Sequence, residues 1–274
     1  MFNYESFIGK CDEKPLESYP ADGGFVGILR TIACVGDSLS SGEFEAVNTI
    51  TGNRLYMDRF DYSWGQYMAR MAGCTVHNFS RGGMTAKEYN EHFGNAMGYF
   101  RPELAANAYM IALGVNDLLN RGQPAGRVED ICLEDWRKNA DTFAGHYGAI
   151  IQRYKKIRPE AKFFLINFPV NSNYTPERKA AAEAHDALLR ELCKLFSNTY
   201  LIDLRNHAPD FGDADFRKRF YLGGHMAPAG YLFFAKLVVS YTDYLIRHDL
   251  ESFRTVGLMG TEYETTDGAE KNIL

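Results

Sequence analysis

Short apolar runs alternate five times with longer helical patterns along this 274-residue chain. We predict strands at residues 31–35, 75–78, 109–113, 162–167 and 200–203. Strands that are separated by helices pair most simply in parallel, because the helix carries the chain back across the sheet. The alternation therefore predicts an α/β fold with helices on both faces of a parallel sheet. In such sheets, ligands bind beyond the carboxyl ends of the strands.

The helical patterns share a three- and four-residue recurrence of apolar side chains. The stretch 229–247 is apolar on nearly every side, so we expect this helix to be largely buried. The remaining helices are predicted at 62–71, 86–97, 133–158 and 177–196.

The chain shows no internal repeat and no Gly/Ser linker, which predicts one domain over residues 26–249. Residues 1–25 are then an N-terminal extension. Residues 250–274 form a tail that is either a surface extension or an arm of a homo-oligomer.

Composition excludes several classes of protein. The net charge is −5 and no run of Lys or Arg stands out, which disfavours nucleic acid and anionic membranes as partners. No stretch approaches 18 consecutive apolar residues, so we expect no membrane span. The five cysteines are scattered without a C-x-x-C pair, and residues 1–14 lack the features of a secretion signal. These features predict a cytoplasmic protein in a reducing compartment.

Four clusters of polar residues lie between the predicted strands and helices. Three follow predicted strands, GDSLSSG at 36–42, NFSRGGMT at 78–85 and GVND at 114–117, and the fourth, GGHMAP at 223–228, precedes the last helix. If the sheet is parallel, all four lie at the same edge of it.

That edge would carry the groups that acyl transfer requires. A serine hydroxyl such as that of Ser38 needs a neighbouring base, a role that an imidazole such as that of His225 can fill. An oxyanion needs preorganised donors, commonly backbone N–H groups and an amide side chain such as that of Asn116. Gly83 lets the backbone approach a substrate closely. Asp37 is interpreted as structural, because its neighbour carries the hydroxyl.

In this order, the clusters resemble the sequence blocks of the SGNH (GDSL-type) hydrolases. The resemblance implies a flavodoxin-like three-layer α/β/α sandwich with a five-stranded parallel sheet. It also implies that Ser38 is the nucleophile and His225 the base. The oxyanion hole would comprise the N–H groups of Ser38 and Gly83 and the side chain of Asn116. The implied activity is hydrolysis of a small or carbohydrate-borne O-acyl ester, acetyl-like, through an acyl-enzyme.

One position departs from the family pattern. The aspartate that usually stands three residues before the histidine is replaced by Leu222. Either a backbone carbonyl accepts from the imidazole, or another acid reaches in, or the enzyme is slow or inactive. We favour the carbonyl of Leu222. The third reading leads to an alternative function, a non-catalytic or very slow ligand-binding relative.

Other chemistry has less support in the sequence. The histidines show no metal-ligand spacing, so we predict no metal and no cofactor. The first loop lacks G-x-G-x-x-G and a P-loop lysine, which disfavours flavin or nucleotide binding. The loop at 43–60, with Tyr56 and Phe60, is predicted to form the rim of the substrate site.

Overall fold

The computed structural model describes residue 10 and residues 12–264 of the chain. Its main sheet has five parallel strands in the order β4-β1-β5-β6-β7. The strands are β1 (Thr31–Gly36), β4 (Thr75–Ser80), β5 (Ala108–Ala112), β6 (Lys162–Ile166) and β7 (Thr199–Ile202). In sequence order this arrangement is 2-1-3-4-5, the order of flavodoxin-like folds. The predicted α/β fold and its five-stranded parallel sheet are confirmed.

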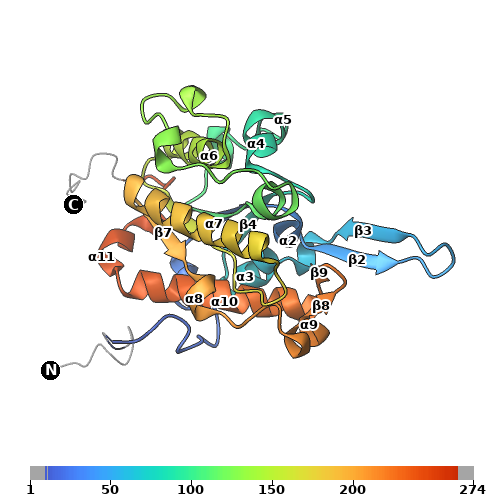
Figure 1. The fold of residues 1–274 in the computed structure, drawn as a ribbon. Helices are drawn as coiled ribbons and strands as arrows, with labels where there is room; N and C mark the ends of the chain where they lie inside the picture. The colour runs from blue at the N-terminus through green and yellow to red at the C-terminus, as the bar shows by residue number, and fades with distance from the viewer. Residues whose placement is uncertain (1–9, 11, 265–274) are drawn as a thin grey trace.

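Helices cover both faces of the sheet (Figure 1). One face packs against α3 (Trp64–Ala72), α10 (Pro228–Arg247) and α11 (Leu250–Phe253). The other packs against α4 (Ala86–Glu88), α6 (Phe143–Ile157) and α7 (Pro176–Leu195).

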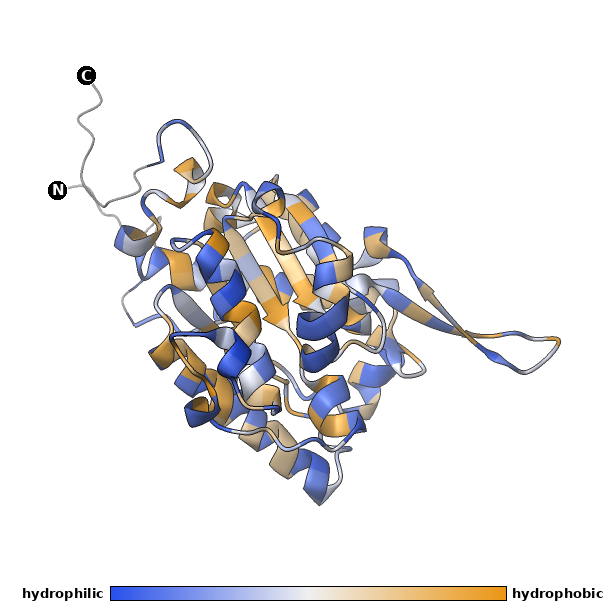
Figure 2. Ribbon diagram, turned by 90° about the horizontal axis from the view of Figure 1, so that it is seen from above, coloured by the Kyte–Doolittle hydropathy of each residue, from blue (hydrophilic) through white to orange (hydrophobic). Residues whose placement is uncertain are grey.

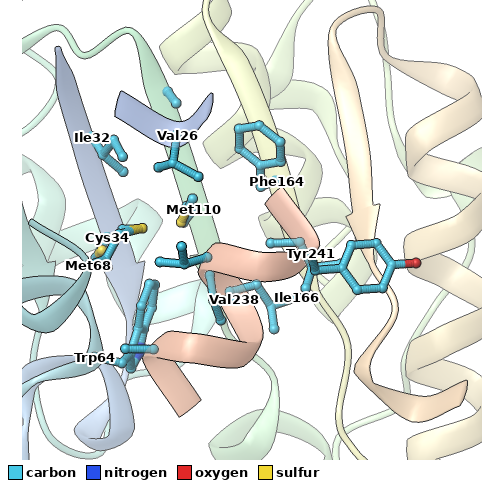
Figure 3. Close-up of a cluster of buried hydrophobic side chains, with 14 of the residues drawn as sticks. Val26, Ile32, Cys34, Trp64, Met68, Met110, Phe164, Ile166, Val238 and Tyr241 are labelled. Atoms are coloured by element: carbon cyan, nitrogen blue, oxygen red, sulfur yellow. The ribbon is translucent and has the colours of Figure 1, made fainter. Parts of the chain in front are cut away.

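Strand periodicity divides the core into two clusters. Ile32 and Cys34 of β1 are buried on the α10 side, whereas Ala33 and Val35 are buried on the α6 side. Because both faces are covered, the central strands β5 (AYMIA) and β6 (KFFLI) are almost entirely apolar, and hydrophobic strand segments lie inside the molecule in Figure 2. The edge strand β4 (TVHNFS) is mixed. Figure 3 shows the α10-side cluster, where Trp64 and Val238 come together with side chains of the strands.

Shorter elements complete the fold. They are η1 (Gly24–Ile28), α2 (Ser38–Ser41), β2 (Glu43–Val47), β3 (Arg54–Asp58), η2 (Phe60–Tyr62), η3 (Tyr89–Phe93), α5 (Gly94–Ala96), η4 (Pro102–Leu104), η5 (Val115–Asn120), η6 (Val128–Asp130), η7 (Trp136–Lys138), α8 (Leu204–His207), α9 (Ala214–Phe220), β8 (Tyr221–Leu222), β9 (His225–Met226) and η8 (Val256–Leu258).

The helix predicted at 133–158 begins later than its apolar spacing suggests. In the structure α6 begins at Phe143, because the hydroxyl of Thr142 caps it by accepting from the N–H of Gly145. The side chain of Asn139 donates to the carbonyl of Gly145 and ties the preceding loop to the helix. Trp136 lies in the separate short turn η7.

The segment after residue 250 contributes to the core. Phe253, Val256 and Met259 are buried in the cluster beneath α10. The predicted boundary at residue 250 therefore places three core residues in the tail, whereas residues 265–274 lie outside the described part. Within the residues described, no helix combines the length and apolarity needed to cross a membrane.

Residues 43–58, predicted as a loop, form an antiparallel hairpin of β2 and β3. It projects from the body of the molecule (Figure 1). The hairpin base lies beside the strand that carries His225, since β2 contacts both β8 and β9. The hairpin thus brings its first residues to the edge where the polar clusters meet.

Candidate active site

Ser38 opens a single helical turn, α2, directly after β1. Asp37 caps this turn, and its carboxylate accepts from the N–H of Leu39 at 3.1 Å. Gly42 ends the turn with φ of +77°, a left-handed conformation that favours glycine. The Ser38 side chain is partly exposed, and its hydroxyl has no hydrogen-bond partner among the described residues. A hydroxyl in this setting is accessible to a bound ester.

The loop after β4 supplies backbone donors beside this turn. Gly83 has φ of +71°, and no atom lies within 4 Å of the place that a Cβ would occupy. The neighbouring Gly82 lies against the carboxylate of Glu43, since a Cβ there would be 2.2 Å from Oε2. The α2 turn packs against β4, so this loop and the Ser38 turn share one edge of the sheet.

Asn116 links three of the polar clusters. Its Nδ2 donates to the carbonyl of Met84 at 3.1 Å and lies 3.5 Å from Oδ2 of Asp37. Its Oδ1 accepts from Nδ2 of Asn120 at 3.0 Å, which fixes the orientation of the amide. The clusters that are distant in sequence therefore meet where the parallel sheet predicts.

Two buried carboxyl groups support this arrangement. Burial raises the pKa of Asp37 to about 7, and the nearby charge of Asp117 adds to the effect. Burial likewise raises the pKa of Asp117 to about 6. Asp117 accepts from the N–H of Ala86 at 2.9 Å and so connects the third cluster to the second.

The raised pKa of Asp37 predicts a pH-dependent cost to stability. The folded state binds this proton more tightly than the unfolded chain, so the stability it contributes is full below about pH 4 and is lost as pH rises to about 7. Asp37→Asn keeps an acceptor for the Leu39 N–H. We expect it to raise the free energy of unfolding relative to wild type by about 1–4 kcal/mol near pH 8.5, with little effect near pH 4.

Urea denaturation of both proteins at the two pH values measures the difference. Asp61→Asn, at an exposed aspartate, is the matched control and should show no such pH dependence. An equal effect of Asp37→Asn at both pH values would contradict the prediction.

His225 lies in β9, which pairs with β8 so that His225 stands opposite Leu222. The imidazole is 16% exposed and lies between two carboxylates of β2. Its Nε2 is 3.1 Å from Oε1 of Glu43, and its Nδ1 is 3.5 Å from Oε2 of Glu45. The ring of Tyr56 packs edge-on against it, with centroids 5.8 Å apart.

The structure brings the serine turn and the histidine strand together. Cα atoms of α2 and β9 lie within 8 Å of one another. No hydrogen bond joins Ser38 to His225 in the described part of the chain, and Nε2 faces Glu43 instead. Unliganded sites often show such contacts lengthened, and they tighten when substrate binds.

Comparison with known proteins shows which family the chain resembles. The family model of the GDSL-like lipases/acylhydrolases matches residues 34–232, which include all four polar clusters. The chain belongs to the GDSL-like lipase/acylhydrolase family. As a member of it, the chain is a hydrolase of ester bonds. None of the curated proteins compared matches the chain.

Solved structures resemble this GDSL-like hydrolase in fold. A family two carbohydrate esterase from Clostridium thermocellum, in complex with cellohexaose, has a TM-score of 0.53 at 15% identity; the match covers 88% of this chain and 66% of that one. A Lactobacillus plantarum protein has a TM-score of 0.53 at 16% identity, with 78% and 97% of the two chains covered. At these identities the likeness shows the fold alone.

Leu222 does not have the role predicted for it in this GDSL-like hydrolase. Nδ1 of His225 is buried without a hydrogen-bond partner, so the carbonyl of Leu222 does not accept from it. Leu222 pairs with His225 through the backbone of the two strands, and the Leu222 side chain is exposed.

Glu43 and Glu45 are the residues near the imidazole that sequence reasoning missed. A signal for them exists, because the residues 51–53, Thr-Gly-Asn, are typical of a tight turn between two strands. A hairpin there would place both acids on one face of β2. Their contact with His225, 180 or more positions away, depends on the tertiary structure.

A second cluster of acidic and histidine side chains lies elsewhere on the surface. Ligand atoms of Glu91, Asp141 and His146 lie within 4.8 Å of one another. The ammonium of Lys87 lies 2.7 Å from both carboxylate oxygens of Asp141, which lowers the pKa of that carboxyl to about 2. The cluster is therefore an ion-pair network.

Proposed function

We propose that this GDSL-like hydrolase cleaves a small or carbohydrate-borne O-acyl ester, acetyl-like, through an acyl-enzyme on Ser38. One observation carries the proposal: the Ser38 turn, the Gly82–Gly83 loop, Asn116 and His225 meet at one edge of the sheet. This edge combines an accessible hydroxyl, backbone donors, an amide and an imidazole, which together suffice for acyl transfer.

In the acylation step, Oγ of Ser38 attacks the ester carbonyl while Nε2 of His225 takes the hydroxyl proton. For this transfer the imidazole must turn from Glu43 towards Ser38, a rearrangement that bound substrate would favour. The tetrahedral intermediate then collapses. The alcohol leaves with the proton from His225, and the acyl group stays on Ser38.

The oxyanion of that intermediate would be held by the N–H groups of Ser38 and Gly83 and by Nδ2 of Asn116. Nδ2 of Asn116 donates one hydrogen bond of ordinary length, to the carbonyl of Met84, and makes only a 3.5 Å contact with Asp37. The hydrogen that faces Asp37 is therefore the one available to an oxyanion. In deacylation, water attacks the acyl-enzyme with His225 as base and releases the carboxylic acid.

A small pocket next to the serine turn supports a short acyl group. Asp37, Leu39 and Ser40 form one wall, and residues of β6, α10 and the β6–α7 loop form the others. Its volume is about 90 Å³, well below the several hundred Å³ of pockets that take drug-sized ligands. Ser40 and Trp64 both line the pocket, and their side-chain polar atoms, Oγ and Nε1, are buried without hydrogen-bond partners.

This pocket predicts a preference for short acyl chains. We expect kcat/KM for 4-nitrophenyl esters to be highest from acetyl to butyryl and to fall by about tenfold or more at octanoyl, because each misfit methylene costs roughly 1–3 kcal/mol. Tyr174→Ala, which shortens a partly exposed side chain of the pocket wall, should move the preference to longer chains. Octanoyl and acetyl esters cleaved equally well by the wild type would contradict this prediction.

The carbohydrate part of the proposal rests on the esterase from Clostridium thermocellum, whose structure holds cellohexaose. Acetylated cello-oligosaccharides are therefore the first natural esters to assay, with release of acetate as the readout.

The function itself is tested by comparing wild type with Ser38→Ala on 4-nitrophenyl acetate. Binding of acetylated sugars without acetate release by the wild type would favour the non-catalytic alternative.

The cytoplasmic location and the homo-oligomer stay predictions. A reducing compartment would leave cysteines as free thiols, and Cys34, Cys74, Cys132 and Cys193 are free.

A further inference from the structure

Two carboxylates of the β2 strand flank the imidazole of His225. Side chains alternate along a strand, so Glu43 and Glu45 project from the same face of β2. Glu43 lies at Nε2 and Glu45 at Nδ1, at 3.1 and 3.5 Å. In a serine hydrolase one nitrogen must exchange a proton with the serine, and the other needs an acceptor that fixes the ring.

Glu45 is held in place by neighbouring groups. Its Oε2 accepts from the N–H of Gly224 at 2.7 Å, and its Oε1 forms an ion pair with the guanidinium of Arg54 on β3. Its side chain is only 6% exposed. The Gly224 bond is the largest cause of a lowered pKa of Glu45, so this carboxylate stays charged at neutral pH.

The turn before His225 leaves room for this carboxylate. A Cβ at Gly223 would lie 2.7 Å from Cδ of Glu45, and one at Gly224 would lie 3.1 Å from its Oε2. Gly223 also has φ of +62°. The two glycines that precede the histidine therefore serve both the turn and the approach of Glu45.

The imidazole has one buried atom that lacks a partner, and this atom faces Glu45. Nδ1 is buried without a hydrogen bond, an arrangement that is unfavourable when such an atom is a donor. Oε2 of Glu45 is 3.5 Å away, so a small rotation of the ring forms the missing bond.

Glu43 is less suited to this task. Its carboxylate faces both Gly82 and Nε2, the nitrogen that must reach Ser38 in the proposed mechanism. Burial raises the pKa of Glu43, so it holds its charge less firmly than Glu45 does. Glu43 competes with Ser38 for Nε2, whereas Glu45 leaves Nε2 free.

We propose that Glu45 is the positioning residue that orients His225, in place of the acid missing at Leu222. The acid comes from the hairpin that follows the nucleophile turn, whereas the family's usual acid precedes the histidine by three residues. This inference rests on the proposed function, because it assigns a role within that mechanism.

The first test compares kinetics on 4-nitrophenyl acetate. We expect Glu45→Gln to lower kcat by about 10²- to 10⁴-fold with KM within about threefold of wild type, since only the transition state needs the oriented, stabilised imidazolium. Glu45→Asp keeps the charge and should recover part of the loss. Glu191→Gln, at an exposed ion pair on α7, is the matched control and should behave as wild type.

The second test does not depend on activity. In a Ser38→Ala background, ¹⁵N NMR of the histidine rings reports which nitrogen of His225 holds the proton. We expect Nδ1–H as the dominant neutral tautomer when Glu45 is present and a mixture of tautomers in Ser38→Ala/Glu45→Gln. This comparison separates loss of orientation from loss of folding.

Three outcomes would overturn the inference. They are wild-type kcat in Glu45→Gln, an unchanged tautomer in the double variant, or a tautomer change caused by Glu43→Gln instead of Glu45→Gln. Each leaves the esterase proposal standing if Ser38→Ala is inactive. Full activity in Ser38→Ala would instead remove the proposed function, whatever the NMR comparison shows.

Discussion

Replacing Ser38 by alanine is expected to lower kcat for 4-nitrophenyl acetate by about 10⁴-fold or more. Without Oγ no acyl-enzyme can form, so only the slower attack of water in the oxyanion site remains. The fold should not change, because the Ser38 hydroxyl has no hydrogen-bond partner within the described residues. Turnover measured by nitrophenolate release, together with thermal unfolding, checks both parts of the expectation.

Ser197→Ala is the matched control, because this serine is exposed on the loop after α7. It should retain wild-type turnover. A fluorophosphonate should label wild type and Ser197→Ala but not Ser38→Ala. Labelling or turnover that persists without the Ser38 hydroxyl would show that another group is the nucleophile.

Replacing His225 by alanine is expected to lower kcat by roughly 10⁴-fold, because this imidazole is the base proposed to take the proton from Ser38. Truncation also leaves a space between Glu43 and Glu45 where the ring had been. Added imidazole should bind there and restore part of the activity, with a dependence on imidazole concentration that saturates. Initial rates with and without imidazole measure both effects.

His92→Ala is the control for this variant, since that imidazole is 78% exposed. It should lose no activity and gain none from imidazole. The double variant Ser38→Ala/His225→Ala should be no slower than Ser38→Ala alone, because the two residues act as one unit. If the loss of kcat in the double variant equals the product of the two single fold-losses, the histidine acts independently of the serine.

Two acidic side chains beside the candidate catalytic groups, Asp37 and Glu43, reduce the stability of the folded hydrolase when they are ionised. Asp37 is buried and Glu43 is partly buried, both with raised pKa values, so their ionisation costs the folded state free energy. Both lie beside groups assigned to catalysis. Asp37→Asn separates these effects, because it removes the charge while keeping the cap of the Ser38 turn.

Local patterns in the sequence predicted the sheet well. Each of the five predicted strands lies within about two residues of its observed bounds, because buried parallel strands are short apolar runs between polar loops. The start of α6 was not predicted, since apolar spacing extends through Trp136 whereas the Thr142 cap decides where the helix begins. The hairpin was missed because its residues are mostly exposed and carry a weak apolar alternation.

The sequence by itself determined which polar clusters meet, because a parallel sheet places the carboxyl ends of its strands at one edge. It thereby brought Ser38, Gly83, Asn116 and His225 into one candidate site. Only the tertiary structure decided what surrounds the imidazole. Glu43 and Glu45 reach His225 through the pairing of β2 with β3 and the packing of that hairpin on β9. Contacts of that kind depend on how elements far apart in the chain pack, and no local pattern encodes them.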